Sequence, residues 1–183
     1  MEKAKRKQIP NYTCFIDLKA AYDTVNREAL WKVLLEYGLP NKVYRLIKCF
    51  YEGSSASVRS EGCMSDWFEV STGLRQGYLL SPALFNVFID FVVRRALAGM
   101  EKYGVKIQYK MPDGRMSRGD LVEDEERLKA LLYADDLVII SESEEGLKEF
   151  IESMEDQTQK WGLTICVKNK KCKSTARRKR IRI

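Results

Sequence analysis

The chain has 183 residues, of which 45% are hydrophobic and 32% are charged, and its formal net charge is +6. This length and apolar content suit one compact domain with a hydrophobic core. The chain contains no histidine, which excludes histidine triads, histidine general bases and histidine-ligated zinc. Any catalysis must therefore use carboxylates, lysine, tyrosine, backbone groups or a bound metal.

The number and spacing of the cysteines indicate the redox state of the cellular compartment. There are five of them, and no two form a C-x-x-C pair. An odd number without metal-ligand spacing argues for a reducing compartment, and against a disulfide framework or a zinc knuckle. No signal peptide is visible, and no uncharged run is long enough to cross a bilayer. We therefore expect an intracellular protein without a membrane partner.

Positive charge is concentrated at the ends of the chain. Residues 168–183 hold nine of the 32 Lys and Arg residues and no Asp or Glu, which leaves 23 basic against 26 acidic residues elsewhere. Basic ends are typical of segments that bind a polyanion or a nuclear-import receptor, and also of solvated disorder. We expect a basic lead at residues 1–9, a domain at residues 10–167 and a disordered tail at residues 168–183.

The first predicted element is a strand at residues 11–18. Its alternation would place Tyr12, Cys14, Ile16 and Leu18 on one face, and Thr13, Phe15 and Asp17 on the other. Asp17 is a charged residue in a run that otherwise suits a core. By itself it could be a simple strand-end cap.

Two helices and a hairpin are predicted next. Asn26 is the expected N-cap of the first helix, and Pro40 lies in the first turn of the second. Helical spacing predicts that the second helix buries Val43, Leu46, Ile47 and Phe50. The segments 56–59 and 67–71 then predict a β-hairpin.

A glycine-bracketed loop follows, and it leads into a long helix. Ser81 is the expected N-cap and Pro82 the first helical residue, so both residues are predicted only to start this helix. The apolar residues at helical spacing are Leu84, Phe85, Phe88, Ile89, Val92 and Ala96. The pattern predicts an amphipathic helix with a wide buried face.

The last third of the chain predicts a short strand at residues 105–109, an exposed loop at residues 111–126 and a hairpin at residues 131–140. Ser141 and Glu144 form a capping-box signature for a further long helix. Leu163–Val167 is the expected final strand. Because helices do not alternate one-for-one with strands, we predict an α+β fold: an antiparallel sheet with helices packed on one face.

An acidic pair, Asp135–Asp136, lies at the tip of the predicted hairpin. Two like charges about 4 Å apart repel by roughly 4 kcal/mol at an effective dielectric constant near 20. A fold accepts such a pair where a cation, usually a divalent metal, binds. Aspartate is also an ordinary turn residue, and that alternative stays open for the pair by itself.

If the first strand and the hairpin are neighbours in one sheet, Asp17 meets Asp135 and Asp136. Carboxylate oxygens together with substrate phosphates are the usual ligands of Mg²⁺. Two such ions about 4 Å apart activate an attacking oxygen and stabilise a leaving one in phosphoryl transfer. A loop of backbone donors, residues 73–77, precedes a helix N-terminus. These features together predict phosphoryl-transfer chemistry.

Three segments resemble, in order and spacing, the catalytic motifs of reverse transcriptases from non-LTR, LINE-like retrotransposons. FIDLKAAYD (residues 15–23) resembles the first motif, RQGYLLSPALFN (75–86) the second and YADD (133–136) the third. The resemblance covers residues 9–173 and implies the palm of an RNA-directed DNA polymerase with a ferredoxin-like core. It leads us to expect that fingers and thumb are largely missing.

The resemblance also implies a set of metal ligands. Asp17 and Asp135 would be the main ligands, Asp136 a supporting acid and the carbonyl of Leu18 a further ligand. The expected ions are two Mg²⁺, with Mn²⁺ as a substitute. The expected partners are an RNA template, a DNA primer, deoxynucleoside triphosphates and other regions of the element's polyprotein, in the cytoplasm and nucleus.

Further residues are implied to bind the nucleotide. Tyr22 would stack under the incoming sugar and reject a 2′-hydroxyl group; the alternative is a core aromatic residue at the start of a helix. Arg75, Gln76 and Gly77 would lie against the templating base and the nucleotide. Asp23 is expected to be a cap or a surface residue.

Residues 162–171 resemble the family's fourth motif with departures. Cys166 stands where asparagine is usual, and the general-acid lysine could be Lys168, Lys170 or Lys171. An alternative to a polymerase is a truncated, non-catalytic remnant that binds nucleic acid through its basic ends. The tail residues assigned to nucleic-acid binding are Lys168, Lys170, Lys171, Lys173, Arg177 and Arg178. A third possibility is an inert fragment with exposed apolar surface.

Overall fold

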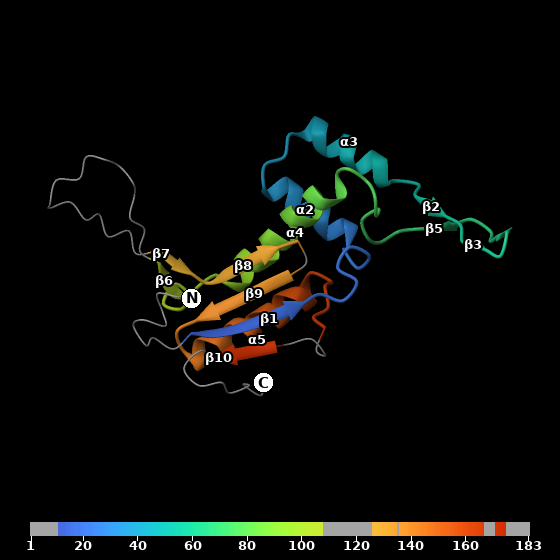
Figure 1. Ribbon diagram of the computed structural model, residues 1–183. Helices are drawn as coiled ribbons and strands as arrows, with labels where there is room; N and C mark the ends of the chain where they lie inside the picture. Colours follow the sequence, from blue (N-terminus) through green and yellow to red (C-terminus); the bar gives the residue numbers. More distant parts are fainter. Residues whose placement is uncertain (1–10, 108–125, 135, 167–170, 175–183) are drawn as a thin grey trace, which may run out of the picture. The chain divides into compact units, whose positions relative to one another are not determined.

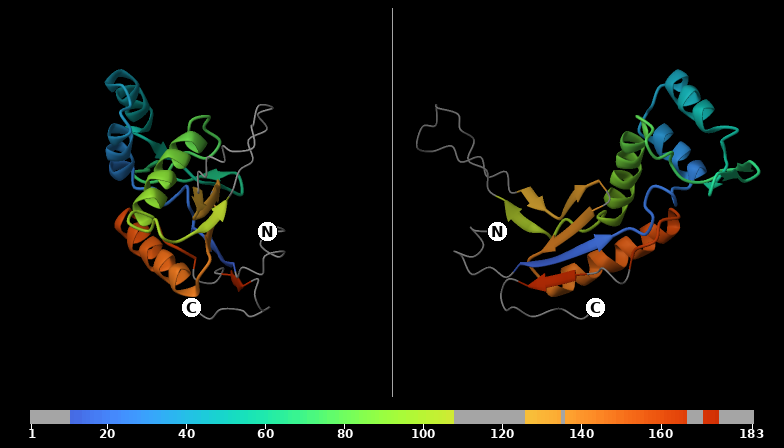
Figure 2. Two further views of the ribbon diagram at one scale, coloured as in Figure 1. Left: turned by 90° about the vertical axis from the view of Figure 1, so that its left-hand side faces the viewer. Right: turned by 45° about the vertical axis from the view of Figure 1, so that its right-hand side comes forward.

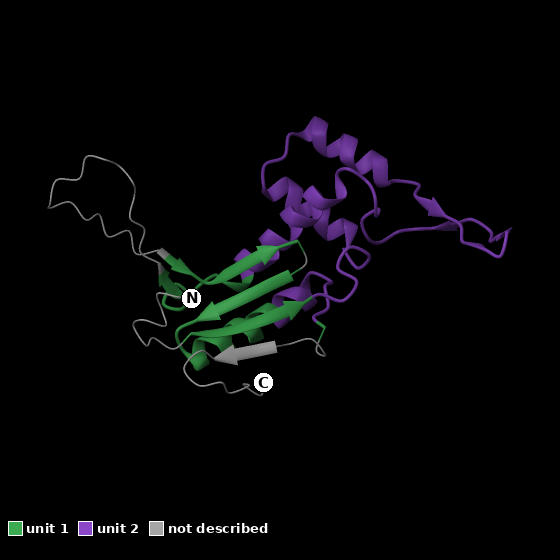
Figure 3. Ribbon diagram, viewed as in Figure 1, with its two compact units in different colours: residues 1–17, 96–154, 166–183 green, residues 18–95, 155–165 purple. Residues whose placement is uncertain are grey.

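The computed structural model describes residues 11–107, 126–134, 136–166 and 171–174 (Figure 1). The chain divides into two compact units, which are coloured separately in Figure 3. Unit 1 comprises residues 1–17, 96–154 and 166–183, and unit 2 comprises residues 18–95 and 155–165. In the described part of the chain, no helix has the length and apolar character that a membrane span requires.

Unit 1 is built on a four-stranded antiparallel sheet with the strand order β10-β1-β9-β8 (Figure 2). Its strands are β1 (Tyr12–Asp17), β8 (Ala130–Tyr133), β9 (Asp136–Ser141) and β10 (Lys171–Ser174). A smaller antiparallel pair joins β6 (Val105–Ile107) to β7 (Glu126–Leu128). The predicted first strand and acidic hairpin are therefore neighbours in one sheet.

The two faces of this sheet differ in burial. Cys14 and Ile16 of β1 lie opposite Ile139 and Leu137 of β9, and all four side chains are buried. Helix α5 (Glu144–Lys160) runs along one face (Figures 1 and 2), and it buries Leu147, Phe150, Ile151 and Met154. Each such side chain stabilises the fold by roughly 1.5–3 kcal/mol. On the other face, Thr13 is buried but Phe15 is 41% exposed and Asp17 is half-buried, so that face is open towards the Asp17 end of β1.

The start of α5 differs from the prediction. Strand β9 extends to Ser141, which pairs with Tyr12 of β1, so the helix begins later than the capping-box pattern indicates. The cap is Ser143, whose Oγ accepts a hydrogen bond of 3.0 Å from the amide of Gly146. Glycine is needed at that position, because a Cβ on Gly146 would lie 2.5 Å from Cδ1 of Tyr103.

The C-terminal strand is also displaced from its predicted position. Among the described residues of the predicted strand, 163–166, the structure has a single antiparallel bridge, from Ile165 to Leu18. Strand β10 lies instead inside the segment that we expected to be disordered, so that expectation is wrong for residues 171–174. Its backbone pairs with the edge of β1, which would otherwise present unpaired backbone groups. The local pattern of this lysine-rich segment does not show that pairing.

The predicted exposed loop and the predicted basic lead lie largely outside the described residues. Most of the predicted exposed loop at residues 111–126 lies outside the described residues, as do residues 1–10 and the tail beyond residue 174. The last residue of the predicted loop, Glu126, begins β7, a strand that the sequence patterns did not indicate.

Unit 2 contains α2 (Arg27–Glu36), α3 (Asn41–Tyr51) and most of α4 (Ser81–Ala96). The side chain of Asn26 accepts a hydrogen bond of 2.9 Å from the amide of Ala29, which confirms the predicted cap of α2. The predicted apolar face of α4 is buried along its whole length. The predicted hairpin is present as two short ladders: β2 (Ser55–Ala56) pairs with β5 (Phe68–Glu69), and β3 (Arg59–Ser60) pairs with β4 (Cys63–Met64).

The prediction of which face of α3 is buried is wrong for three of its four residues. Val43, Leu46 and Phe50 are 42%, 54% and 50% exposed, and only Ile47 is buried. The covered side carries Tyr51, whose ring meets Trp31 of α2 edge to face at 5.8 Å. The helix has apolar residues on two stripes, and the aromatic contact with α2 decides which stripe is covered.

Candidate active site

Two of the predicted carboxylates meet at one end of the unit 1 sheet. Asp17 is the last residue of β1 and Asp136 the first residue of β9, and the two lie directly opposite each other in the antiparallel ladder. The carbonyl of Asp17 accepts a hydrogen bond of 2.7 Å from the amide of Cys166, so its backbone groups point away from β9. The acidic residues therefore form a non-hydrogen-bonded pair, in which the Cβ atoms are about 4.5–5.5 Å apart.

The acidic pair lies on the open face of the sheet. Asp17 alternates with Ile16 and shares the face of Phe15, while Asp136 is exposed and Asp17 half-buried. Carboxylates directly opposite each other repel, and carboxylate oxygens on a solvent-accessible face are suitable ligands for a hard divalent cation. The arrangement therefore fits a metal site.

Of the two further predicted metal ligands, Asp135 and the carbonyl of Leu18, the structure describes only Leu18. Asp135 lies outside the described residues, directly after Ala134, whose φ is +53°, so its role stays a prediction. Leu18 is buried and opposite Ile165. The amide of Lys19 donates to the carbonyl of Thr164 at 2.8 Å. Because neighbouring residues of a strand direct their backbone groups to opposite sides, the carbonyl of Leu18 points away from Ile165.

Tyr22 lies in the turn between β1 and α2, and not in a helix. Its ring stacks on Phe85 of α4, with a centroid distance of 4.5 Å and an interplanar angle of 19°. Phe85 is fully buried, whereas Tyr22 is half-buried. One face of the tyrosine ring is therefore supported by the core, and part of the ring stays accessible.

The loop at residues 72–77, which we call the RQG loop, is attached to the turn that carries Tyr22. The amide of Gly73 donates to the carbonyl of Val25 at 2.9 Å, and the amide of Leu74 donates to that of Tyr22 at 2.8 Å. Gly73 has a φ of +76°, and a Cβ there would lie 2.7 Å from the carbonyl oxygen of Asp23. Only glycine fits this position without strain.

Side chains fix the rest of the RQG loop. A guanidinium nitrogen of Arg75 donates to Oγ of Ser54 at 2.8 Å, and Nε2 of Gln76 donates to a carboxylate oxygen of Asp23 at 3.0 Å. Oγ of the buried Ser81 donates to the carbonyl of Arg75 at 2.6 Å. Ser81 thus does more than start α4. Gly77, with a φ of +78°, has open space where a Cβ would be.

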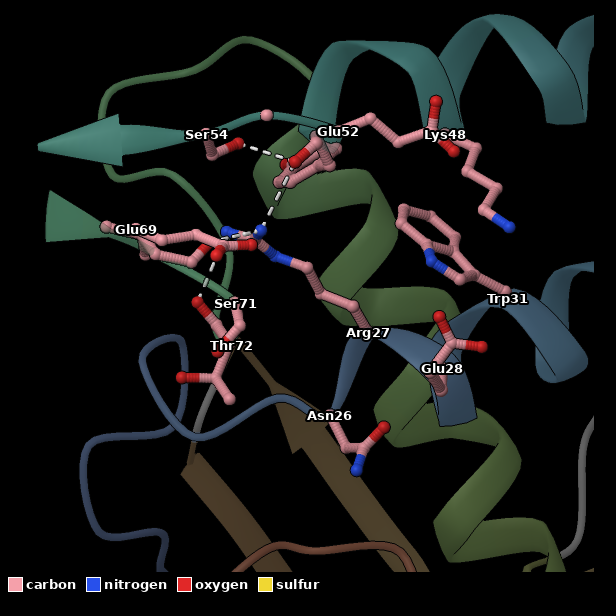
Figure 4. A pocket seen from close by; sticks show the side chains of 13 residues that line it. Asn26, Arg27, Glu28, Trp31, Lys48, Glu52, Ser54, Glu69, Ser71 and Thr72 are labelled. Atoms are coloured by element: carbon pink, nitrogen blue, oxygen red, sulfur yellow. Dashed lines mark hydrogen bonds between the residues drawn. The ribbon is translucent and has the colours of Figure 1, made fainter.

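The residue that the sequence patterns missed is Arg27, the first residue of α2. Its guanidinium group donates four hydrogen bonds to backbone carbonyls, three of which follow β5. Figure 4 shows Arg27 among the residues that line the adjacent pocket, which include every acceptor except Gly73. The acceptors are Tyr51 at 3.3 Å, Val70 at 2.6 Å, Thr72 at 3.2 Å and Gly73 at 2.9 Å. Burial lowers the pKa of Arg27 from its ordinary value. A cation in the first turn opposes the helix dipole, and that conflict was the available signal of a tertiary role.

The predicted nucleic-acid-binding residues lie in the C-terminal segment. In β10, Lys171 is the Cα partner of Phe15, and Lys173 is that of Thr13. Lys168, Lys170, Arg177 and Arg178 lie outside the described residues. Their predicted contacts with nucleic acid stay a prediction.

The sheet, its covering helix and the acidic pair on the open face define the palm of a polymerase. A solved structure of apo telomerase from Candida tropicalis shares this fold, with a TM-score of 0.65 and 16% identity over 92% of this chain and 29% of that chain. The structure of the same telomerase truncated from its C-terminal domain gives a TM-score of 0.62 at 17% identity, over 93% of this chain and 32% of that chain. The α+β fold class is confirmed.

The chain belongs to the reverse transcriptase (RNA-dependent DNA polymerase) family, whose model matches residues 1–183. A Pol polyprotein of the retrotransposable element R2 from Nasonia vitripennis is 29% identical over 165 residues, which are 90% of this chain and 14% of that protein. An RNA-directed DNA polymerase of the mobile element jockey from Drosophila funebris is 26% identical, over 90% of this chain and 16% of that protein. The chain thus spans about a sixth of these relatives or less, and its resemblance to non-LTR retrotransposon enzymes is confirmed.

Proposed function

We propose that this chain is the catalytic palm of an RNA-directed DNA polymerase from a non-LTR retrotransposon. In the reaction, the 3′-hydroxyl oxygen of a primer bonds to the α-phosphorus of a deoxynucleoside triphosphate. The bond from that phosphorus to the bridging oxygen breaks, pyrophosphate leaves, and the hydroxyl proton passes to solvent. The observation that carries this proposal is the register of β1 and β9, which sets Asp17 opposite Asp136 on the open face.

We assign the metal-binding role to Asp17, Asp135, Asp136 and the carbonyl of Leu18. Two Mg²⁺ ions bound there, or Mn²⁺ in their place, would activate the attacking oxygen and stabilise charge on the leaving pyrophosphate. Asp17 and Asp136 contribute oxygen ligands from two neighbouring strands. Because they repel each other without a cation, their arrangement favours the metal-bound state.

We assign nucleotide binding to Tyr22 and the RQG loop. The ring of Tyr22, supported from below by Phe85, would lie under the deoxyribose and leave no room for a 2′-hydroxyl group. Arg75, Gln76 and Gly77 would lie against the templating base and the nucleotide. The open space at Gly77 suits close approach of a ligand to the backbone.

The proposed partners are an RNA template, a DNA primer and deoxynucleoside triphosphates. Basic residues beyond residue 167 would neutralise phosphates, and such binding weakens as the salt concentration rises. Because the curated relatives are parts of much longer polyproteins, other regions of the element's polyprotein are proposed as further partners. The cytoplasm and the nucleus are the proposed sites of action.

Primer extension by the purified chain on an RNA template with Mg²⁺ tests this function. Asp17→Asn and Asp136→Asn should each lower the extension rate by roughly a hundredfold or more, because each removes a charged metal ligand. Asp156→Asn, which removes an exposed carboxylate from α5, is the matched control and should extend like the wild type. Unchanged extension by both acidic-pair variants would contradict the proposal.

A further inference from the structure

Arg27 is a buried cation whose hydrogen-bond partners in the structure are carbonyls, and its guanidinium also lies 5.1 Å from the centroid of the Tyr51 ring. It is 8% exposed, and no acidic side chain among the described residues forms an ion pair with it. Its four acceptors come from three places: the end of α3, the residue after β5 and the RQG loop. A planar guanidinium has five N–H donors in a fixed fork, whereas a lysine ammonium has three around one point. Arginine is therefore suited to hold these segments together in a way that lysine cannot reproduce.

Two short chains of contacts connect Arg27 to Arg75. The carbonyl of Tyr51, which accepts from Arg27, also accepts at 2.6 Å from Oγ of Ser54. That hydroxyl in turn accepts from the guanidinium of Arg75. The phenol of Tyr51 bonds to Oγ of Ser81 at 3.2 Å, and Ser81 donates to the carbonyl of Arg75. Arg27 therefore supports both the backbone of the RQG loop and the side chain of Arg75.

We propose that Arg27 is a positioning residue that sets the RQG loop for the incoming deoxynucleotide. This inference rests on the proposed function, because it assumes that Arg75, Gln76 and Gly77 meet the nucleotide. Arg27 acts through those residues and does not touch the substrate. Its loss should weaken nucleotide binding while the acidic pair in unit 1 keeps its register.

The kinetic test uses Arg27→Lys in the full chain. We expect the KM for the deoxynucleotide to rise by roughly tenfold and kcat to change by less than about threefold, because ground-state positioning is lost rather than chemistry. Val33→Ala is the matched control, because Val33 is a fully buried side chain of the same helix. It takes part in none of the hydrogen bonds that connect the RQG loop to Arg27, Ser54, Ser81 or the Tyr22 turn. An unchanged KM in Arg27→Lys, or an equal rise in Val33→Ala, would overturn the proposal.

Chemical rescue separates positioning from general stability. A cavity of about 410 Å³, lined by Arg27, Trp31, Lys48 and Ser54 among others, opens beside the guanidinium (Figure 4). Guanidinium ions at non-denaturing concentration can therefore reach the space that Arg27→Ala leaves. They should lower the raised KM of this variant, whereas sodium at equal ionic strength should not. If guanidinium ions do not lower the KM of a folded Arg27→Ala protein, the guanidinium contacts of Arg27 do not position the RQG loop.

Hydrogen exchange gives a readout that does not depend on activity. The amides of Gly73 and Leu74 are hydrogen-bonded to the turn that carries Tyr22, so they should exchange several-fold faster in Arg27→Lys than in the wild type and in Val33→Ala. If the wild type does not extend primers but this change is seen, the proposed function fails and the loop-holding role stands. If the wild type extends primers and the exchange is unchanged, the inference about Arg27 fails alone.

Discussion

The two units hold their candidate functional residues in different ways. In unit 1, the register of two paired strands alone sets Asp17 opposite Asp136. In unit 2, the RQG loop has no strand pairing. Two backbone hydrogen bonds join it to the turn that carries Tyr22, and the side chains of Arg27, Ser54 and Ser81 bind it through carbonyls and a guanidinium. The positions of Asp17 and Asp136 should therefore tolerate substitutions of nearby side chains. The conformation of the RQG loop should instead depend on each residue that binds it.

The largest effect on stability should come from Gly73→Ala. Gly73 and Gly38 both have positive φ, but only at Gly73 would a Cβ clash with backbone. We expect Gly38→Ala to cost about 1 kcal/mol. Gly73→Ala should cost about 3 kcal/mol or more, because overpacking adds to the strain. Denaturant unfolding of both variants measures the difference in the free energy of unfolding. Equal losses would show that the backbone of Gly73 does not pack closely against that of Asp23.

A smaller effect is expected from Ser81→Ala. The buried hydroxyl bonds to the carbonyl of Arg75 and to the phenol of Tyr51, and removing it leaves buried polar groups unpaired, at about 1–3 kcal/mol. Ser65→Ala removes a hydroxyl that also makes two hydrogen bonds but lies on the exposed hairpin, and it should cost less. If thermal unfolding shows the same loss for both variants, Ser81 does not support the loop.

The support of Tyr22 can be tested with two phenylalanines of α4. Both Phe85 and Phe88 are fully buried, and Phe85 stacks on Tyr22. Phe85→Leu should lower discrimination against ribonucleotides by roughly fivefold, because an aromatic pair contributes about 0.5–1.5 kcal/mol. Phe88→Leu should lose similar stability and keep the discrimination. Incorporation of both nucleotide types in primer extension gives the ratio; an equal loss in both variants would remove Phe85 from this role.

The smallest effect concerns the acidic pair without metal. Like charges directly opposite each other on paired strands are destabilising. In the presence of a metal chelator, Asp136→Asn should therefore raise the free energy of unfolding by about 0.2–1 kcal/mol. Asp156→Asn should leave it almost unchanged. Denaturant titration at low ionic strength would reveal the difference. A destabilised Asp136→Asn protein would indicate that this carboxylate is structural.

Local patterns predicted the parts of the site that depend on local chemistry. Side-chain alternation placed Asp17 on the face opposite Cys14 and Ile16, and the hairpin pattern placed Asp136 at a hairpin tip. That this hairpin neighbours the first strand was a condition of the prediction, and the pairing of β1 with β9 meets it. The parts that failed depend on tertiary pairing. Ser141 is in a strand rather than at a cap because it pairs with Tyr12, and β10 forms through backbone pairing with β1.

Arg27 shows a second limit of sequence reasoning. Its acceptors are backbone carbonyls from three segments, and a carbonyl carries no sequence signature. The exposed apolar stripe of α3 has the same origin, because periodicity identifies an apolar stripe but not the partner that covers it. Residues whose role is to hold backbone are therefore found from the structure.

Binding of Mn²⁺ to the chain, followed by the loss of the electron paramagnetic resonance signal of the free ion, tests the metal-site account most directly, and it needs no template, primer or turnover. We predict that the wild type and Asp156→Asn bind the ion equally. Asp17→Asn and Asp136→Asn should each bind it at least tenfold more weakly, since each loses a charged oxygen ligand. Equal affinity in all four proteins would contradict the assignment of the acidic pair as a metal site.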